Sequence, residues 1–100
     1  FEYSLLNHYL DISAIYNMSK RKKKAEIDIQ KAEIIAPAGS PRLNSFRPVK
    51  VQNFSSGDPN AKCYSIMISI DQKLNHLIIE PDEKMLQLIK GWMGQKMYID

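Results

Sequence analysis

Large apolar side chains recur at every second position between residues 63 and 70, and this pattern constrains the fold more than any other. In the segment CYSIMISI, one face carries Tyr64, Ile66, Ile68 and Ile70, and the other carries Cys63, Ser65, Met67 and Ser69. A period of two is that of a β-strand, and β-branched side chains favour the same conformation. Residues 71–75 have turn composition and 76–80 (HLIIE) are again apolar, which predicts a second strand pairing with the first.

The hydrophobic period changes from that of a strand to that of a helix after residue 80. Pro81 suits the first position of a helix, and the acidic Asp82 and Glu83 complement its positive end. Apolar residues then fall on one helix face: Met85, Leu88, Ile89 and Trp92, widened by Leu86 and Met93. We therefore predict a C-terminal amphipathic helix whose apolar stripe, Trp92 included, lies in the core.

The remaining segments predict further short strands. Alternation marks residues 25–29, 32–35 and 49–54, whereas the proline-rich residues 36–48 read as a loop. Residues 1–17 are ambiguous, because their apolar side chains fit two strands around Asn7-His8 and also fit one helix. Strands are favoured by β-branched and aromatic content. The prediction is a single, mainly β domain over residues 1–100, with about seven short strands and one helix.

Residues 20–24 read KRKKK and place five positive charges together in a chain whose net charge is only +3. The sequence pI near 9.0 therefore reflects a local cluster. Proteins that follow a nucleic-acid backbone spread their basic residues along a face, so one cluster fits a compact anionic target better. The candidate binding residues are Lys20, Arg21, Lys22, Lys23 and Lys24. The competing interpretation is a solvated loop that only keeps the protein soluble.

No set of residues has the spacing of a catalytic or metal site. Cys63 is the single cysteine, so no disulfide forms within the chain, which suits a reducing compartment. His8 and His76 have no Cys or carboxylate at metal-ligand spacing, and His76 is expected at the edge of the last strand. We expect no catalytic residue, no metal and no cofactor, hence a non-enzymatic protein. No apolar run approaches the ~20 residues that cross a bilayer.

Two segments, KKKAEIDIQKAEII and KCYSIMISIDQKLNHLIIEPDEKMLQLIKGW, resemble pleckstrin-homology (PH) domains. The resemblance implies a PH-like bent β-barrel of seven strands, capped by the C-terminal helix. It also implies that Lys20–Lys24 lie in the loop after the third strand, beside the open end where family members bind inositol phosphates. The tryptophan usual in the closing helix corresponds here to Leu88, with Trp92 one turn later.

The register of this resemblance bears on headgroup recognition. In the best register the family's first strand, and the loop that holds its usual phosphoinositide motif, precede Phe1, so the domain lacks its first strand or receives it from elsewhere. In the alternative register residues 2–6 are that first strand, and the following loop, Asn7-His8, carries no basic motif.

The function expected on these grounds is recruitment to an anionic membrane surface, through phosphoinositide or phosphatidylserine, by a cytoplasmic, peripheral membrane protein. Arg42, Arg47 and Lys50 join the basic cluster if the 36–48 loop folds to the same side. One alternative is a PH-like protein-interaction module with a protein partner. The other reads residues 1–17 as a helix, giving an α-β-β-β-α order similar to double-stranded-RNA-binding domains. Nucleic acid is disfavoured, because the acidic segment EPDEK stands where those domains are basic.

Overall fold

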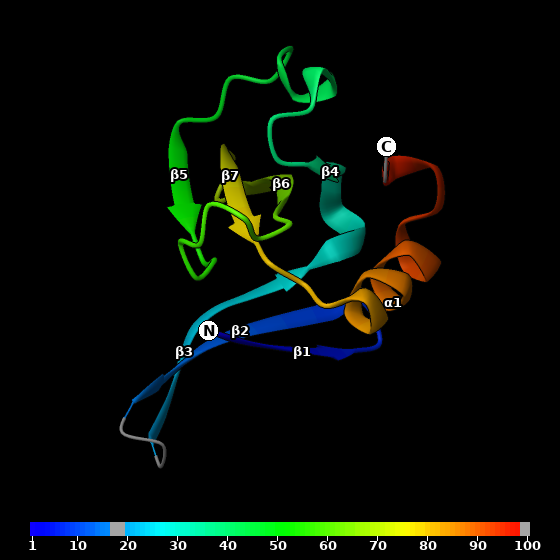
Figure 1. Ribbon diagram of the computed structural model, residues 1–100. Helices are drawn as coiled ribbons and strands as arrows, with labels where there is room; N and C mark the ends of the chain where they lie inside the picture. Colours follow the sequence, from blue (N-terminus) through cyan, green and yellow to red (C-terminus); the bar gives the residue numbers. More distant parts are fainter. Residues whose placement is uncertain (17–19, 99–100) are drawn as a thin grey trace.

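The computed structural model describes residues 1–16 and 20–98, whose strands form two sheets (Figure 1). The first sheet is an antiparallel meander of β1 (Glu2–Leu6), β2 (Tyr9–Tyr16) and β3 (Lys20–Asp28). The second has the order β4-β6-β7-β5, formed by β4 (Ala32–Pro37), β6 (Tyr64–Ile70), β7 (Lys73–Ile79) and β5 (Lys50–Asn53). Strand β5 runs parallel to β7, whereas the other pairs are antiparallel.

One α-helix, α1 (Glu83–Met93), follows the last strand. Short 3-10 helices η1 (Ile29–Lys31), η2 (Pro41–Leu43) and η3 (Gly94–Lys96) complete the elements. The predicted mainly β chain, with seven strands and one C-terminal helix, is confirmed. The expected barrel takes a more open form, because no ladder between the described residues joins the two sheets into a closed barrel.

Residues 2–6 and 9–16 form strands, so the helical alternative for residues 1–17 is wrong; residue 17 itself lies outside the described residues. Tyr3 pairs with Ile12 and Leu5 with Leu10 across the β1–β2 hairpin. Asn7 has a φ of 54°, a left-handed conformation that asparagine tolerates and that tight hairpin turns require. With strands here, the helix-first order of double-stranded-RNA-binding domains does not apply.

The core lies between the two sheets and α1. It contains buried side chains from both sheets and from the helix: Leu10, Ile12, Ile27, Ile66, Ile68, Leu77, Ile79 and Ile89. The predicted alternation of β6 is confirmed, because Tyr64, Ile66 and Ile68 enter this core while Met67 packs on the opposite face of the sheet. Burying each of these isoleucines contributes about 1.5–3 kcal/mol relative to exposure.

The predicted apolar stripe of α1 is partly wrong. Ile89 and Met93 are buried and Met85 and Leu86 pack against the core, whereas Leu88 and Trp92 are 48% and 42% exposed. The helix begins at Glu83, two residues later than the prediction that Pro81 takes its first position. Asp82 is its N-cap, and the Asp82 carboxylate accepts a hydrogen bond from the backbone N–H of Met85 at 2.7 Å.

A second, smaller apolar cluster lies under the loop that precedes β5. It contains Ile34, Ala36, Leu43 and Met67, with Phe46 and Tyr98 packed against it. The Arg42 guanidinium lies 4.0 Å from the centre of the Tyr98 ring, and Arg47 donates to the backbone carbonyls of Asn44 and Phe46. These contacts fix the loop at one end of the molecule.

Candidate functional site

The basic residues 20–24 form the first half of β3, so the prediction that they lie in a loop is wrong. Lys20 pairs with Tyr16 and Lys22 with Ala14 of β2. The strand forms because β2 offers a partner of strong β propensity, and because alternation sends neighbouring charges to opposite faces. This half of the β2–β3 hairpin projects beyond the body of the molecule (Figure 1).

The remaining basic residues named as possible neighbours do not join this cluster. The loop that carries Arg42 and Arg47 lies at the end of the molecule opposite the hairpin, and Lys50 begins β5 at that same end (Figure 1). The candidate site is therefore confined to the hairpin. We call the half formed by residues 14–16 and 20–24 the basic arm.

One face of the basic arm is tied to the protein's own carboxylates. Arg21 Nη2 lies 2.6 Å from Glu2 Oε1 of β1, so this ion pair spans the three-stranded sheet. Lys23 Nζ lies 2.7 Å from Glu26 Oε2 and 3.6 Å from Asp11 Oδ2. The hydrogen bond between Lys23 and Glu26 raises the pKa of the lysine and lowers that of the carboxyl. Two of the five basic side chains thus have carboxylate partners within the sheet.

The other face of the basic arm carries Lys20, Lys22 and Lys24, all exposed. None of these three forms an ion pair with a carboxylate in the described part of the chain. The Lys24 ammonium lies 5.8 Å from the centre of the Tyr16 ring, a cation–π distance. Three positive charges and one aromatic ring therefore share a face.

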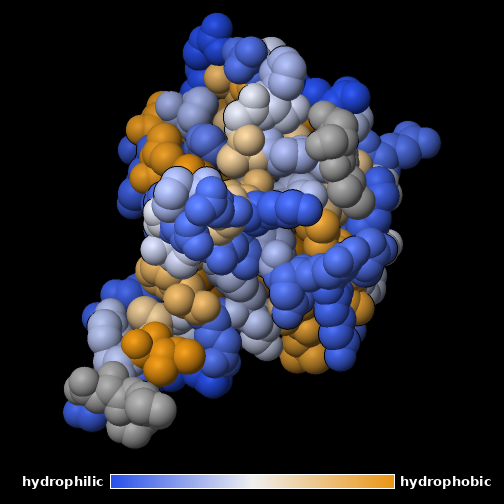
Figure 2. All heavy atoms as spheres, viewed as in Figure 1, coloured by the Kyte–Doolittle hydropathy of each residue, from blue (hydrophilic) through white to orange (hydrophobic). Residues whose placement is uncertain are grey.

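Apolar side chains are also exposed on the basic arm. Tyr16 is 44% exposed and Ile15 is 50% exposed. Hydrophobic atoms accordingly lie beside hydrophilic ones on the projecting arm (Figure 2). A basic surface with aromatic and aliphatic side chains among its charges is chemically suited to an interface that is anionic outside and apolar beneath.

The two histidines have structural partners. His76 Nε2 lies 2.7 Å from Ser65 Oγ, burial lowers the pKa of His76, and Ser65 is only 1% exposed. A serine closed off from solvent in this way cannot reach a substrate. His76 was expected at the edge of the last strand, but it lies in the middle of β7, which starts three residues earlier at Lys73. His8 Nδ1 lies 2.6 Å from Asp28 Oδ1, and no group of three metal-binding side chains occurs among the described residues.

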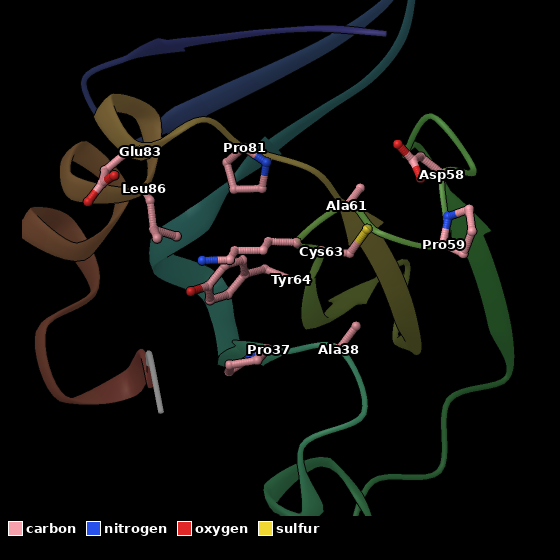
Figure 3. Close-up of a pocket in the computed structure, with 11 residues that line it drawn as sticks. Pro37, Ala38, Asp58, Pro59, Ala61, Cys63, Tyr64, Pro81, Glu83 and Leu86 are labelled. Atoms are coloured by element: carbon pink, nitrogen blue, oxygen red, sulfur yellow. The ribbon is translucent and has the colours of Figure 1, made fainter.

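A cavity of about 720 Å³ lies between the end of β4, residues 58–64 and the start of α1 (Figure 3). Its walls include the rings of Pro37, Pro59, Tyr64 and Pro81 and the side chain of Cys63. Charged Asp58, Lys62 and Glu83 also line it. The cavity could not be predicted from the sequence, because its walls come from segments far apart in the chain that carry no common motif. No residue of the basic arm lines it.

Comparison with known families agrees with the architecture and defines the class of this protein. A family model described as a bacterial PH-like domain (DUF6106) matches residues 1–99. The chain belongs to this family of bacterial PH-like domains. No curated protein and no solved structure gives a match. No helix formed by the described residues is long and apolar enough to span a membrane.

Proposed function

We propose that this PH-like domain is a non-enzymatic module that binds the surface of anionic membranes through its basic arm. The observation that carries the proposal is the exposed face of Lys20, Lys22 and Lys24, which has no carboxylate partner among the described residues, beside the ring of Tyr16. The projection of the arm supports it, since the hairpin extends beyond the body of the domain (Figure 1).

The strength of such binding follows from the number of free charges. Each basic residue near an anionic leaflet contributes about 1 kcal/mol, so three lysines supply at most about 3 kcal/mol. Partial burial of the half-exposed Tyr16 ring at the headgroup level adds an apolar contribution. The result is weak, reversible binding. At physiological salt its electrostatic part acts only within a Debye length of ~8 Å, and added salt weakens it further. This strength suits a module that adds one contact to a larger assembly.

The expected lipid selectivity follows from the position of the three lysines, which do not lie in a pocket among the described residues. They stand on an exposed strand face, and the cavity near α1 contains none of them. We therefore expect the charge of the surface to decide binding, with phosphatidylserine, phosphatidylglycerol and phosphoinositides ranking by charge density. A strong preference for one phosphoinositide would require a headgroup pocket.

Vesicle co-sedimentation tests the proposal. The chain is mixed with neutral phosphatidylcholine vesicles and with vesicles containing each anionic lipid, at low and at physiological salt. The test variant changes Lys20, Lys22 and Lys24 to glutamine, which removes the charge, is only slightly shorter than lysine and suits a strand better than glycine does. Binding that requires anionic lipid and is lost in the variant supports the proposal. Equal recovery with neutral and anionic vesicles contradicts it.

A protein-interaction module is the second candidate, and a different surface favours it. Leu6 precedes the β1–β2 turn and is 75% exposed. In that turn, the centre of the His8 ring lies 5.5 Å from the centre of the half-exposed Trp92 ring of α1. Exposed large apolar side chains such as Leu6 and Trp92 are typical of protein-binding surfaces. Salt separates the two candidates, because high ionic strength weakens lysine-mediated membrane binding but leaves an apolar interface intact.

A further inference from the structure

The five basic residues of β3 differ in the face they occupy, and a β-bulge decides that face. From Tyr9 to Ile12, β2 pairs with β3 in one register, and from Ser13 onward the register shifts by one residue. Ile12 is opposite Ala25 and Ser13 is opposite Lys23, so Lys24 is the extra residue of the bulge.

The shift places Lys20 and Lys22 opposite Tyr16 and Ala14, which continue the face of Leu10 and Ile12. Beyond the body of the domain this face is exposed. Lys24 extends over the Tyr16 ring and so belongs to the same side. We call this side the free face of the arm.

Arg21 and Lys23 occupy the opposite side, opposite Ile15 and Ser13. Their partners Glu2, Asp11 and Glu26 come from all three strands of the sheet. Ser13 is buried although it lies on this side. We call this side the paired face. Lipid contact here would require a phosphate to displace a carboxylate that is already in place, and the surrounding carboxylates would repel that phosphate.

We infer that the free face, with Lys20, Lys22, Lys24 and Tyr16, is the surface that meets an anionic bilayer, while Arg21 and Lys23 are positioning residues that brace the arm. This inference rests on the proposed function and assigns the partner to one side of the two-stranded basic arm. It follows that the five basic residues, adjacent in the sequence, do not contribute equally.

Two double variants with the same loss of charge test the assignment. Lys20→Gln/Lys22→Gln removes two charges from the free face, and Arg21→Gln/Lys23→Gln removes two from the paired face of the same strand. Partition onto vesicles of phosphatidylglycerol and phosphatidylcholine is measured by co-sedimentation for both variants and the parent chain. Far-ultraviolet circular dichroism and a thermal melt confirm that each variant is folded.

The free-face variant is expected to lose about 25-fold in partition coefficient, because each lysine near the surface contributes about fivefold. The paired-face variant is expected to lose less than about threefold, the part due to long-range attraction. Tyr16→Ser, with no change of charge, is expected to weaken binding at a salt concentration where the electrostatic part is already screened.

Two outcomes would overturn the inference, and they are distinguishable. If the parent binds in a salt-dependent way but both double variants lose affinity equally, the proposed function stands and the face assignment is wrong. If the folded parent does not bind phosphatidylglycerol vesicles even at low salt, the proposed function fails and the face assignment fails with it.

Discussion

The hydroxyl of Tyr3 accepts a hydrogen bond from the backbone N–H of Glu80 at 3.0 Å, 77 positions away in the sequence. The same hydroxyl donates to the backbone carbonyl of Phe54. Tyr3 belongs to β1 in the first sheet, Glu80 directly follows β7 and Phe54 directly follows β5 in the second. One side chain thus joins the ends of three strands and fastens the two sheets together.

Replacing Tyr3 with phenylalanine is expected to lower the free energy of unfolding by about 1–3 kcal/mol, because it leaves two backbone groups without their partner. Urea denaturation of the variant measures the loss. The matched control is Tyr9→Phe, since Tyr9 is half exposed; it is expected to change stability by less than about 0.5 kcal/mol. Equal stability of the Tyr3 variant and the parent would contradict the fastening role.

Alkaline pH is expected to weaken the same connection. Burial raises the pKa of Tyr3, against the opposing effect of its hydrogen bond with the backbone of Glu80. A group whose pKa is higher in the folded state stabilises the fold below its unfolded value, about 10 for tyrosine, and loses that contribution as pH rises through the folded value. Stability should therefore fall above about pH 10, and less steeply in Tyr3→Phe. Equal slopes for the two proteins would refute this.

Adjacent positions of α1 are expected to respond very differently to truncation. Ile89 is fully buried, so Ile89→Ala should cost about 2–5 kcal/mol through lost burial and the cavity left behind. Leu88→Ala, on the exposed side, should change stability by about 0.5 kcal/mol or less. Chemical denaturation of both variants tests the orientation of the helix. A larger loss for Leu88→Ala than for Ile89→Ala would contradict this orientation of α1.

The start of α1 should depend on the chemistry of its cap. Asp82→Ala is expected to cost about 1 kcal/mol, because the N–H of Met85 loses its acceptor. Asp82→Asn retains a capping oxygen and should cost much less. Thermal melts of the two variants make the comparison, and equal losses would show that the charge of Asp82 contributes more than its hydrogen bond.

Acid should release a stabilising contribution from Asp28. Although burial opposes it, hydrogen bonds from His8 and from the backbone N–H of Gln30 lower the pKa of this carboxyl. A depressed pKa stabilises the fold above the unfolded value, about 4, and this contribution disappears as pH falls through the folded value. The stability difference between the parent and Asp28→Asn should therefore shrink below about pH 4. A difference that stays constant from neutral pH to pH 2 would argue against it.

The strands and the C-terminal helix were predictable because local patterns specify them. Alternation in β6 and the change of period after Ile79 are local signals, and the structure follows them. The exposure of Trp92 was not predictable in this way. Leu88 and Trp92 fit a helical stripe as well as Ile89 and Met93 do, and only the position of the sheets decides which pair is covered.

The candidate site was predicted in composition but not in geometry. The run from Lys20 to Lys24 identified the charged residues, but charge alone says nothing about pairing with β2. The ion pair between Arg21 and Glu2 joins residues 19 positions apart through the fold of the meander. Which lysines remain free of carboxylates depends on such long-range partners.

The bulge at Lys24 divides the β2–β3 ladder into two sections whose registers differ by one residue. From Tyr9 to Ile12, β2 pairs with β3 in one register, and from Ser13 to Tyr16 it pairs in a register shifted by one residue. Were the first register to continue through the arm, Arg21 and Lys23 would face the side now held by Lys20 and Lys22, and the charges braced by carboxylates would change places with the free ones. One extra residue thus decides which basic side chains point to each face of the arm. Inserting or deleting two residues within the arm would change its length, but each remaining side chain would keep its face and the pairing in the core would stay the same.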